Sequence, residues 1–442
     1  MPAPLLAIET TPTLPKAADV VVIGGGVVGA FAAYYLARRG VDVALLEKGR
    51  IGAEQSSRNW GWCRQQNRDA RTLSLASHSL DLWGRLSAEL GEESGFRRCG
   101  LLYLSEDEAE IARWAAWREV AAQAGVTTHI LDRHEAAARG AGTTRAWKGG
   151  VFSPSDGIGD PARAAPVVAR GVLAAGGSVH QMCAARGIET EAGRVSAVVT
   201  ERGTIRTRTA VMAGGAWASS FCRQLGIRFP QSSVRQSILA IRDAVAGLPD
   251  ALHTPGVSIT RRGEGEGHTL AISGRGSVDV TPQHILFSRE FAPMLARRWR
   301  LLRPGGAEGL RWSHGTLRRW RLDAPTPMER HRILDPRPDP RLISETHRRA
   351  VALLPALRGT TVAAAWAGYI DSTPDGVPAI GEVTGLPGFL LAAGFSGQGF
   401  GTGPGSGHLV ADLVTGATPT VDPRPYHPDR FAVSAWGKVA EF

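Results

Sequence analysis

The chain has 442 residues, of which 43% are hydrophobic and 21% are charged, a length that corresponds to about two or three domains and a composition typical of a globular protein. These values exclude a small binding module and a disordered chain. The net charge of +10 comes almost wholly from arginine, and pairs such as Arg38-Arg39 and Arg318-Arg319 are scattered among acidic residues. A nucleic-acid-binding surface would gather them on one stripe, so we expect no nucleic-acid partner.

The N-terminal residues lack the features of a secretion signal, and we expect residues 1–16 to form a disordered tail. The four cysteines, at positions 63, 99, 183 and 222, form no C-x-x-C pair. This spacing disfavours structural zinc and favours reduced thiols. Residues 20–37 are apolar, but the glycines within them predict a strand, a turn and a helix rather than a membrane span. We therefore expect a cytoplasmic protein with no metal site and no transmembrane segment.

The first predicted elements form a strand, a turn and a helix. Residues 20–23 are an apolar, β-branched run typical of a buried parallel strand, and residues 30–39 follow a helical pattern. Between them, Gly24, Gly26 and Gly29 match the pattern G-x-G-x-x-G. In this pattern the first glycine permits the turn, the second removes a Cβ that would block a pyrophosphate, and the third lets helix and strand pack closely. The phosphates would bind at the positive end of the helix dipole.

A second strand is predicted at 41–46, and it ends on Glu47, 23 residues after Gly24. A carboxylate at this position accepts hydrogen bonds from the hydroxyls of an adenosine ribose. No arginine follows Glu47 directly, which favours a free 2′-hydroxyl over a 2′-phosphate, although Arg50 lies nearby. The segment therefore predicts FAD or NAD rather than NADP, and it leaves the choice between FAD and NAD open.

The later part of the chain separates these two cofactors. A strand at 209–212 runs into Gly-Gly-Ala-Trp at 214–217, and a strand at 389–393 leads into a segment with six glycines between 394 and 405. A helix is expected at 408–414. Because each glycine costs backbone entropy on folding, this density indicates that a flat ring lies against bare backbone. A flavin is such a ring, so the pattern favours FAD.

Four blocks of sequence resemble the FAD-dependent amine and amino-acid oxidoreductases, the family that includes D-amino-acid oxidase, glycine oxidase and monomeric sarcosine oxidase. The blocks are V-I-G-G-G-V-V-G at 22–29 with Glu47, A-G-G-A-W at 213–217, W-A-G at 366–368 followed by T-P-D-G-V-P-A-I-G at 373–381, and A-G-F-S-G-Q-G-F at 393–400. The four blocks occur in the same order as in the family, and the resemblance extends over nearly the whole chain, from about residue 19 to residue 431.

The resemblance implies an α/β fold in which a Rossmann-like FAD-binding domain is interrupted by an α+β substrate domain built on a mostly antiparallel sheet. The expected segments of the FAD-binding domain are 17–90, 151–225 and 361–442, and those of the substrate domain are 91–150 and 226–360. Alternating apolar stretches at 238–241, 269–272 and 284–287 suit antiparallel strands of the substrate domain.

The resemblance also implies a set of residues that bind FAD. They are Gly24, Gly26, Val28, Gly29, Glu47, Lys48, Ser57, Arg58, Asn59, Gly215, Trp217, Gly368, Gly397, Gln398, Gly399, Phe400 and Gly401. Some relatives attach FAD covalently through a cysteine near the C-terminal flavin segment or a histidine in the early segment. Here no cysteine follows Cys222, and Gln55-Ser56-Ser57 contains no histidine. We therefore expect non-covalent FAD.

Family membership implies hydride transfer from an amine-bearing carbon to flavin N5, followed by hydrolysis of the imine to a keto acid or aldehyde and reoxidation by oxygen or another acceptor. Glycine and D-amino-acid oxidases typically carry W-A-G-L-R-P, whose arginine grips the substrate carboxylate. This chain reads W-A-G-Y-I-D, with Ile370 in place of that arginine. Either the substrate lacks this carboxylate or another arginine binds it.

Three residues are the candidates for contact with substrate. Arg64 is the first, because the corresponding segment of sarcosine oxidase lies under the flavin and supplies an arginine there. Arg275, just after a predicted strand, is the second, and the Tyr369 hydroxyl is expected to line the site. Trp62 and Trp366 pack against either the substrate side chain or the core.

Several alternatives stay open at this stage. The substrate is an amino acid or, alternatively, a secondary or N-methylated amine of the kind that sarcosine oxidase uses. The electron acceptor, the stereochemistry of the substrate and the oligomeric state are not determined by the sequence. A nucleic-acid-binding flavoprotein belongs to a different class, and neither a basic stripe nor an appended domain supports it.

Overall fold

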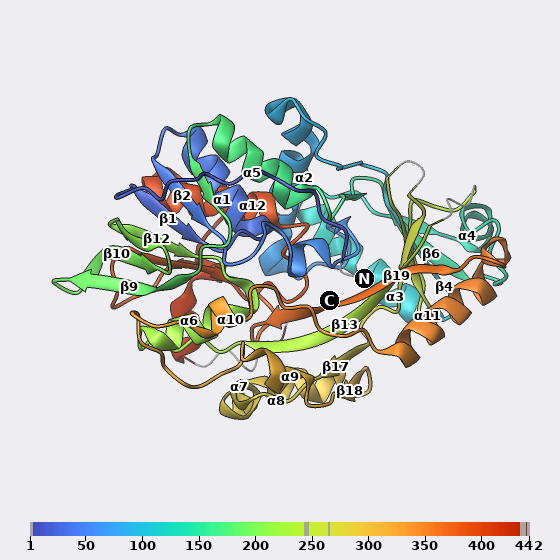
Figure 1. Cartoon of the computed structure of the whole chain (residues 1–442). Coiled ribbons are helices and arrows are strands. Elements are labelled where there is room, and N and C mark those ends of the chain that lie inside the picture. Colours follow the sequence, from blue (N-terminus) through green and yellow to red (C-terminus); the bar gives the residue numbers. More distant parts are fainter. Residues whose placement is uncertain (1–2, 243–246, 264–265, 434–438, 440–442) are drawn as a thin grey trace.

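The computed structural model describes residues 3–242, 247–263, 266–433 and 439, and it has a mixed α/β fold with two large sheets (Figure 1). The first sheet has six strands. In spatial order they are β20 (Ala379–Glu382), β21 (Phe389–Ala393), β12 (Thr209–Met212), β1 (Val20–Ile23), β2 (Val43–Leu46) and β8 (Ser178–His180). All neighbours are parallel except β20 and β21, which are antiparallel.

Helix α1 (Val27–Arg38) follows β1 and is buried along almost its whole length. It is enclosed because it packs against α5 (Ala164–Ala174) and α12 (Gly403–Thr415) as well as against the sheet. Helix α2 (Ala70–Leu90) packs against α12 in turn. A helix buried on all sides is apolar all round, which explains the alanine-rich sequence of α1.

Strands from distant parts of the chain meet in this sheet. The expected strands at 20–23, 209–212 and 389–393 are β1, β12 and β21, with the same bounds. Helix α12 begins at Gly403, five residues before the predicted start, because the glycine-rich segment itself turns into the first helical turn. A separate three-stranded sheet follows β8 in the chain and consists of β9 (Ala185–Glu191), β10 (Arg194–Thr200) and β11 (Gly203–Arg206).

The second large sheet has ten strands. They are β18 (Leu302–Pro304), β17 (Gly276–Val278), β13 (Ser232–Ile241), β16 (His268–Ala271), β15 (Ser258–Arg261), β14 (Ala251–His253), β4 (Leu101–Ser105), β6 (Gly149–Ser153), β5 (His129–Leu131) and, paired with β13 only, β19 (Val362–Ser372). The sheet is mixed, since β14 with β4 and β17 with β18 are parallel pairs among antiparallel ones. Figure 1 shows the two long strands, β13 and β19, running side by side from the elements around the first sheet toward the rest of the second sheet.

The remaining elements are short or cover the second sheet. The helices are α3 (Glu108–Gln123), α4 (Arg133–Arg139), α6 (Ala218–Gln224), α7 (Pro282–Leu286), α8 (Ser288–Arg298), α9 (Glu308–Trp312), α10 (Pro327–Arg330) and α11 (Pro340–Leu353), and the short strands β3 (Trp62–Cys63) and β7 (Gly157–Ile158) pair with each other. The five 3₁₀ turns are η1 (Gln55–Ser57), η2 (Gly215–Trp217), η3 (Pro355–Leu357), η4 (Arg424–Tyr426) and η5 (Pro428–Val433).

Two sequence predictions are wrong. Residues 284–287 lie in α7 and its C-terminal cap rather than in a strand, because Thr281 caps the helix N-terminus and Pro282 occupies its first turn. Residues 3–16 are not a free tail, since the amide of Leu6 donates to the carbonyl of Ala162 at 3.0 Å and the amide of Thr11 donates to that of Val179. Edge strand β8 thus offers backbone acceptors that the sequence pattern does not reveal.

Within the described ranges, no helix combines the length and the apolar character needed to cross a membrane. All four cysteines are free thiols. Over the same residues, no three or more His, Cys, Asp and Glu side chains are grouped so that they could hold a metal ion.

Candidate active site

One cavity of about 1540 Å³ is lined by residues of both large sheets. It is larger than the range of about 300–1,000 Å³ that holds a drug-sized ligand. Both glycine-rich segments line it, the first at Gly24, Gly26 and Val28 and the second at 397–400. The two ends of the chain therefore converge on a single elongated site.

The three glycines of the first motif have different surroundings. Gly24 has a φ of +112°, and a Cβ on it would lie 2.5 Å from the carbonyl oxygen of Ala213. A Cβ on Gly29 would overlap the carbonyl oxygen of Gly24. A Cβ on Gly26 would meet only the hydroxyl of Ser56, at 3.2 Å. Gly24 and Gly29 are thus required by the turn and by packing, whereas the space beside Gly26 belongs to the cavity.

The N-terminus of α1 is suited to an anion. No acidic residue lies in its first turn. Its N-cap residue is Gly26, which has no side chain to accept a hydrogen bond from the helix amides. The amide of Val27 donates to the Ser56 hydroxyl at 2.8 Å, while the amide of Val28 has no acceptor within the helix because it lies in the first turn. Val28 lines the cavity, so a phosphate fits this amide and the positive end of the helix dipole.

Glu47 directly follows β2 and lines the cavity beside the first glycine motif. Its carboxylate accepts hydrogen bonds from the amides of Gly25, at 2.8 Å, and Gly49, at 2.7 Å. Burial raises the pKa of Glu47, and these two amides oppose that rise. Each carboxylate oxygen retains a lone pair, so the orientation fixed by the backbone leaves acceptors for the two hydroxyls of a ribose.

Two buried polar atoms in the cavity wall lack a hydrogen-bond partner among the described residues. They are the indole nitrogen of Trp217 and the amide oxygen of Gln398. The Trp217 ring also lies 4.8 Å from the ammonium group of Lys48. Buried polar atoms are normally paired, so these two indicate a polar ligand in the cavity. With the bare N-terminus of α1 and the carboxylate of Glu47, they fit a dinucleotide such as FAD.

Strand β19 approaches the cavity closely at Gly368, where a Cβ would lie 3.1 Å from the Cβ of Arg58. The buried guanidinium of Arg58 donates to the carbonyls of Ala53, at 3.0 Å, and Ala367, at 2.9 Å, and pairs with Asp335 at 2.6 Å. Arg58 therefore joins the 50s segment to β19, because its stem lies against Gly368 and its guanidinium binds the carbonyl of Ala367.

The carboxylate of Asp371, which the sequence analysis did not single out, holds the C-terminal glycine segment. It accepts hydrogen bonds from the amide of Gly394 and from the side chain of Gln231, both at 2.9 Å. The amide of Ser396 donates to the carbonyl of the same residue at 2.7 Å. Burial raises the pKa of Asp371, and its hydrogen-bond donors oppose the rise. This residue thus ties β19 to the loop that lines the cavity.

We expect Asp371→Ala to lower the thermal stability of the protein by several degrees and to weaken FAD binding. The substitution leaves the amide of Gly394 and one N–H of the Gln231 side chain without an acceptor, at a cost of about 1–3 kcal/mol each, while the carbonyl of Gly215 still accepts from Gln231. Thermal unfolding with and without added FAD measures both effects. Asp371→Asn keeps one acceptor oxygen and should lose less; equal melting temperatures for wild type and Asp371→Ala would contradict this role.

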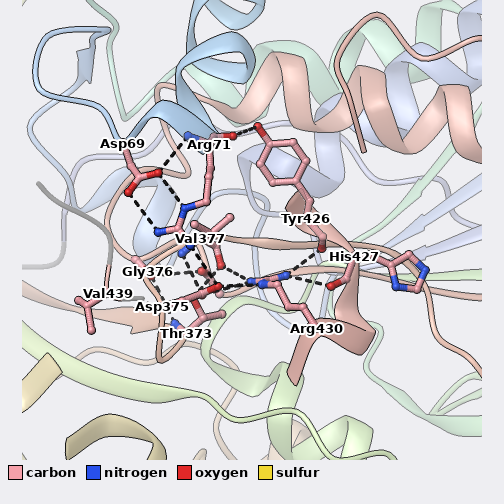
Figure 2. A network of polar contacts seen from close by, with 12 residues as sticks. Asp69, Arg71, Thr373, Asp375, Gly376, Val377, Tyr426, His427, Arg430 and Val439 are labelled. Carbon is pink, nitrogen blue, oxygen red and sulfur yellow. Dashed lines mark hydrogen bonds and ion pairs between the residues drawn. The ribbon is translucent and has the colours of Figure 1, made fainter. Parts of the chain in front are cut away.

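The T-P-D-G motif at 373–376 anchors the C-terminal segment instead of facing the cavity (Figure 2). Asp375 is buried and accepts from the guanidinium of Arg430 at 2.9 Å. Arg430 also donates to the carbonyl of Val377 at 2.6 Å, and Arg71 of α2 lies 3.9 Å from the same carboxylate. The motif therefore fixes the turn between β19 and β20, and with it the position of β19.

Arg64 lines the cavity next to a group of aromatic rings, and its backbone lies close to Gly401 of the second glycine segment. Its Nη1 donates to the carbonyl of Gln66, at 2.8 Å, and to the hydroxyl of Tyr103, at 3.1 Å. The Tyr103 ring lies 5.1 Å from that of His253 and 6.3 Å from that of Trp62. Burial, together with the charge of Arg64, lowers the pKa of His253 to about 3, so this imidazole is neutral. The Arg64 guanidinium thus lies beside uncharged rings in this chamber of the cavity, held by the carbonyl of Gln66 and the hydroxyl of Tyr103.

The other two substrate candidates are engaged elsewhere. The Tyr369 hydroxyl donates to Asp279 at 3.0 Å, although the residue lines the cavity. Asp279 is in turn paired with Arg235, whose Nε lies 2.7 Å away. Arg275 does not line the cavity and pairs with Glu345 at 3.3 Å. Of the three candidates, Arg64 alone places donors in the chamber.

Among the other sequence-based candidates, most line the cavity and a few lie behind its wall. Gly24, Gly26, Val28, Glu47, Lys48, Arg58, Asn59, Gly215, Trp217, Gly368, Gly397, Gln398, Gly399 and Phe400 line it, whereas Gly29, Ser57 and Gly401 do not. The carbonyl of Gly401 accepts from the indole of Trp83 at 3.0 Å. The Lys48 ammonium is occupied by Glu54 and two backbone carbonyls. Trp62 lines the chamber, and Trp366 packs in a small core cluster with Ile238.

Several lining residues carried no sequence signal. Trp114 and Trp117 of α3 and His253 of β14 reach the chamber from segments remote from every motif. Arg68 lies four residues after Arg64 in a stretch without regular structure. Ser56, whose hydroxyl accepts from the amide of Val27, was not among the predicted FAD-binding residues, although Ser57 and Arg58 were. Tertiary packing brings these residues together, and no local sequence pattern predicts that they meet.

Comparison with known proteins places this geometry among related flavoenzymes. A family model described as FAD dependent oxidoreductase (DAO) matches residues 19–413. Glycine oxidase from Pseudomonas putida is 28% identical over 93% of this chain and 98% of its own length, and mouse mitochondrial sarcosine dehydrogenase is 25% identical over 95% of this chain but only 42% of its own length. The structure of L-amino acid deaminase from Proteus myxofaciens, in complex with anthranilate, has a TM-score of 0.92 at 28% identity and covers 98% of this chain and 97% of that one.

Proposed function

The chain belongs to the DAO family of FAD-dependent oxidoreductases, and from this premise we propose that it deaminates an amino acid oxidatively, giving an imine that hydrolyses to a keto acid and ammonia. The observation that carries the proposal is Arg64, whose guanidinium is held in the wall of the cavity beside aromatic rings. Relatives that match nearly the full length of this chain are named for action on amino acids.

Bound FAD would supply the oxidant, accepting a hydride from the carbon that bears the amine. The protein's residues supply binding and position. The first turn of α1 and Glu47 would hold the pyrophosphate and the ribose, and the loop at 397–400 would support the ring. Arg64 would bind the substrate carboxylate and so orient the amine-bearing carbon. The surrounding rings of Trp62, Tyr103 and His253 would pack against the substrate.

A second candidate is oxidation of a secondary or N-methylated amine. Two observations favour it, namely the absence of the family arginine at Ile370 and the similarity to a sarcosine dehydrogenase. The two reactions release different products, since deamination gives ammonia whereas demethylation gives formaldehyde.

The test is turnover of the FAD-loaded protein on a panel of L-, D- and N-methyl amino acids. Peroxide and the reduction of an artificial dye are both recorded, so that an oxidase and a dehydrogenase are both detected. We expect ammonia in proportion to electrons transferred, without formaldehyde. Formaldehyde with N-methyl substrates and no ammonia from primary amino acids would favour the second candidate, and no turnover with any substrate would contradict both.

We expect FAD to be released on denaturation. Cys183 is the one cysteine that lines the cavity among the described residues, and it lies near β2 rather than near the loop at 397–400. Acid precipitation should therefore leave a colourless pellet and a yellow supernatant. A pellet that stays yellow after washing would show a covalent bond.

The two sheets support the division of the chain that the sequence predicts. Every strand of the six-stranded sheet falls in the segments 17–90, 151–225 and 361–442. The ten-stranded sheet draws on 91–150 and 226–360, with β6 at the boundary and β19 reaching across from the last segment. The end of that segment falls outside the described residues except for Val439. We infer an FAD-binding part and a substrate part joined through β19, and the four free thiols support a cytoplasmic location.

A further inference from the structure

Arg68 is a buried cation to which the proposed function assigns no role. It lines the cavity, yet only 5% of its surface is exposed. Its Nε donates to the carbonyl of Arg64 at 3.3 Å. Over the part of the chain that the structure describes, its two terminal nitrogens donate to no acceptor. The Trp117 indole donates to the carbonyl of Arg68 at 2.7 Å and so fixes the backbone at this point.

No acidic side chain among the described residues forms a direct ion pair with Arg68. Burial, followed by the charge of Arg64, lowers its pKa, but an arginine stays protonated in a protein. Asp156 is the buried acid that acts on both arginines, and its oxygens accept from the backbone amides of Gln65, at 2.7 Å, and Gln66, at 3.3 Å. Its carboxylate is therefore held by backbone rather than by either guanidinium.

The acids that line this part of the cavity are also occupied. Glu110 accepts from the hydroxyl of Ser105 at 2.7 Å, and Asp69 caps α2 and pairs with Arg71 at 2.9 Å. Arg68 and Arg64 thus present two positive charges to one chamber. A buried charge without a direct partner is costly, so a chamber with Arg68 in its wall favours an anionic ligand.

We propose that Arg68 is a second ligand of the substrate carboxylate, acting beside Arg64, so that the enzyme selects amines that carry a carboxylate over amines that lack one. This rests on the proposed function. Nη1 of Arg64 is occupied by Gln66 and Tyr103, which leaves its Nε and Nη2 for substrate. A carboxylate accepts about four hydrogen bonds, enough for both guanidinium groups. The pair, carried by one short segment, replaces the family arginine that is missing at Ile370.

The test compares the binding of anthranilate and aniline to the FAD-loaded protein, followed by the change in the flavin spectrum. The two probes share a ring and an amine and differ by one carboxylate. In Arg68→Gln we expect the dissociation constant for anthranilate to rise at least about tenfold while that for aniline is unchanged. Arg275→Gln is the matched control, because that arginine pairs with Glu345 outside the cavity, and it should change neither constant.

Arg68→Lys keeps the charge but loses the planar fork, so we expect an intermediate loss for anthranilate. If Arg68→Gln fails to bind FAD, the same ratio measured in Arg68→Lys decides the question. An unchanged ratio of the two constants, an equal loss for both probes, or a wild type that binds anthranilate no better than aniline would overturn the proposal. Failure of the proposed function is distinct, because it would leave these constants intact while no amino acid reduces the flavin.

Discussion

Gly26→Ala is expected to give a folded protein that binds FAD roughly tenfold to a hundredfold more weakly than the wild type. A Cβ at this position meets only the Ser56 hydroxyl, at 3.2 Å, so the protein itself accommodates it. The same Cβ projects into the space where the pyrophosphate must approach the backbone, and overpacking of this kind costs about 1–3 kcal/mol. Titration of the apoprotein with FAD measures the affinity, and thermal unfolding of the apoprotein measures the fold.

Gly29→Ala and Gly306→Ala are the controls for this prediction. A Cβ on Gly29 overlaps the carbonyl oxygen of Gly24, so its substitution should destabilise the apoprotein itself. A Cβ on Gly306 has no atom within 4 Å, so that variant should behave as the wild type does. Wild-type FAD affinity in Gly26→Ala would show that the first motif does not hold the pyrophosphate.

Arg64→Ala is expected to lower kcat/KM for amino acids by at least about 30-fold, mostly through KM, and to leave the FAD content unchanged. Removing one partner of a buried, hydrogen-bonded ion pair costs about 2–5 kcal/mol, and each 1.4 kcal/mol is a factor of ten. The substitution also removes the hydrogen bond from Arg64 to the Tyr103 hydroxyl. Neither residue belongs to the first glycine motif, so FAD binding should be retained. Steady-state kinetics on the best substrate of the panel, with the flavin content measured on the same sample, checks both parts.

Arg275→Ala serves as the control for Arg64→Ala, because it removes the same charge from a position outside the cavity. We expect its kinetic constants to match those of the wild type. An unaltered KM in Arg64→Ala would remove the assignment of this arginine. A large effect in Arg275→Ala would mean that the long-range field of the protein, and not a contact, determines substrate affinity.

The cofactor half of the site could be predicted from sequence because its rules are local. The turn at Gly24, the bare backbone at Gly26 and the acid at Glu47 each follow from a strand, a turn and a helix that are adjacent in the chain. The pairing of β1 with β12, and of β12 with β21, then brings the second glycine segment to the same cavity. Apolar runs alone predicted those three strands with correct bounds.

The substrate half could be predicted only in part. Arg64 was found through a family resemblance, whereas Arg68 was not singled out, because its burial beside Arg64 becomes visible only in the fold. Tyr369 was expected to face substrate, and its hydroxyl instead meets Asp279, a residue 90 positions away in the chain. Contacts of this kind depend on how β19 is rotated against its neighbours, which a sequence pattern does not determine.

In the proposed function, both glycine segments hold one FAD and the chamber beside it holds an amino acid. The most direct measurement is the visible spectrum of the purified, FAD-saturated protein under anaerobic conditions, before and after addition of amino acids from the panel. We predict one flavin per chain, with bands that bleach on addition of an amino acid and return when air or a dye is admitted. A protein that takes up no flavin, or whose flavin stays oxidised with every amino acid and amine, would contradict the account.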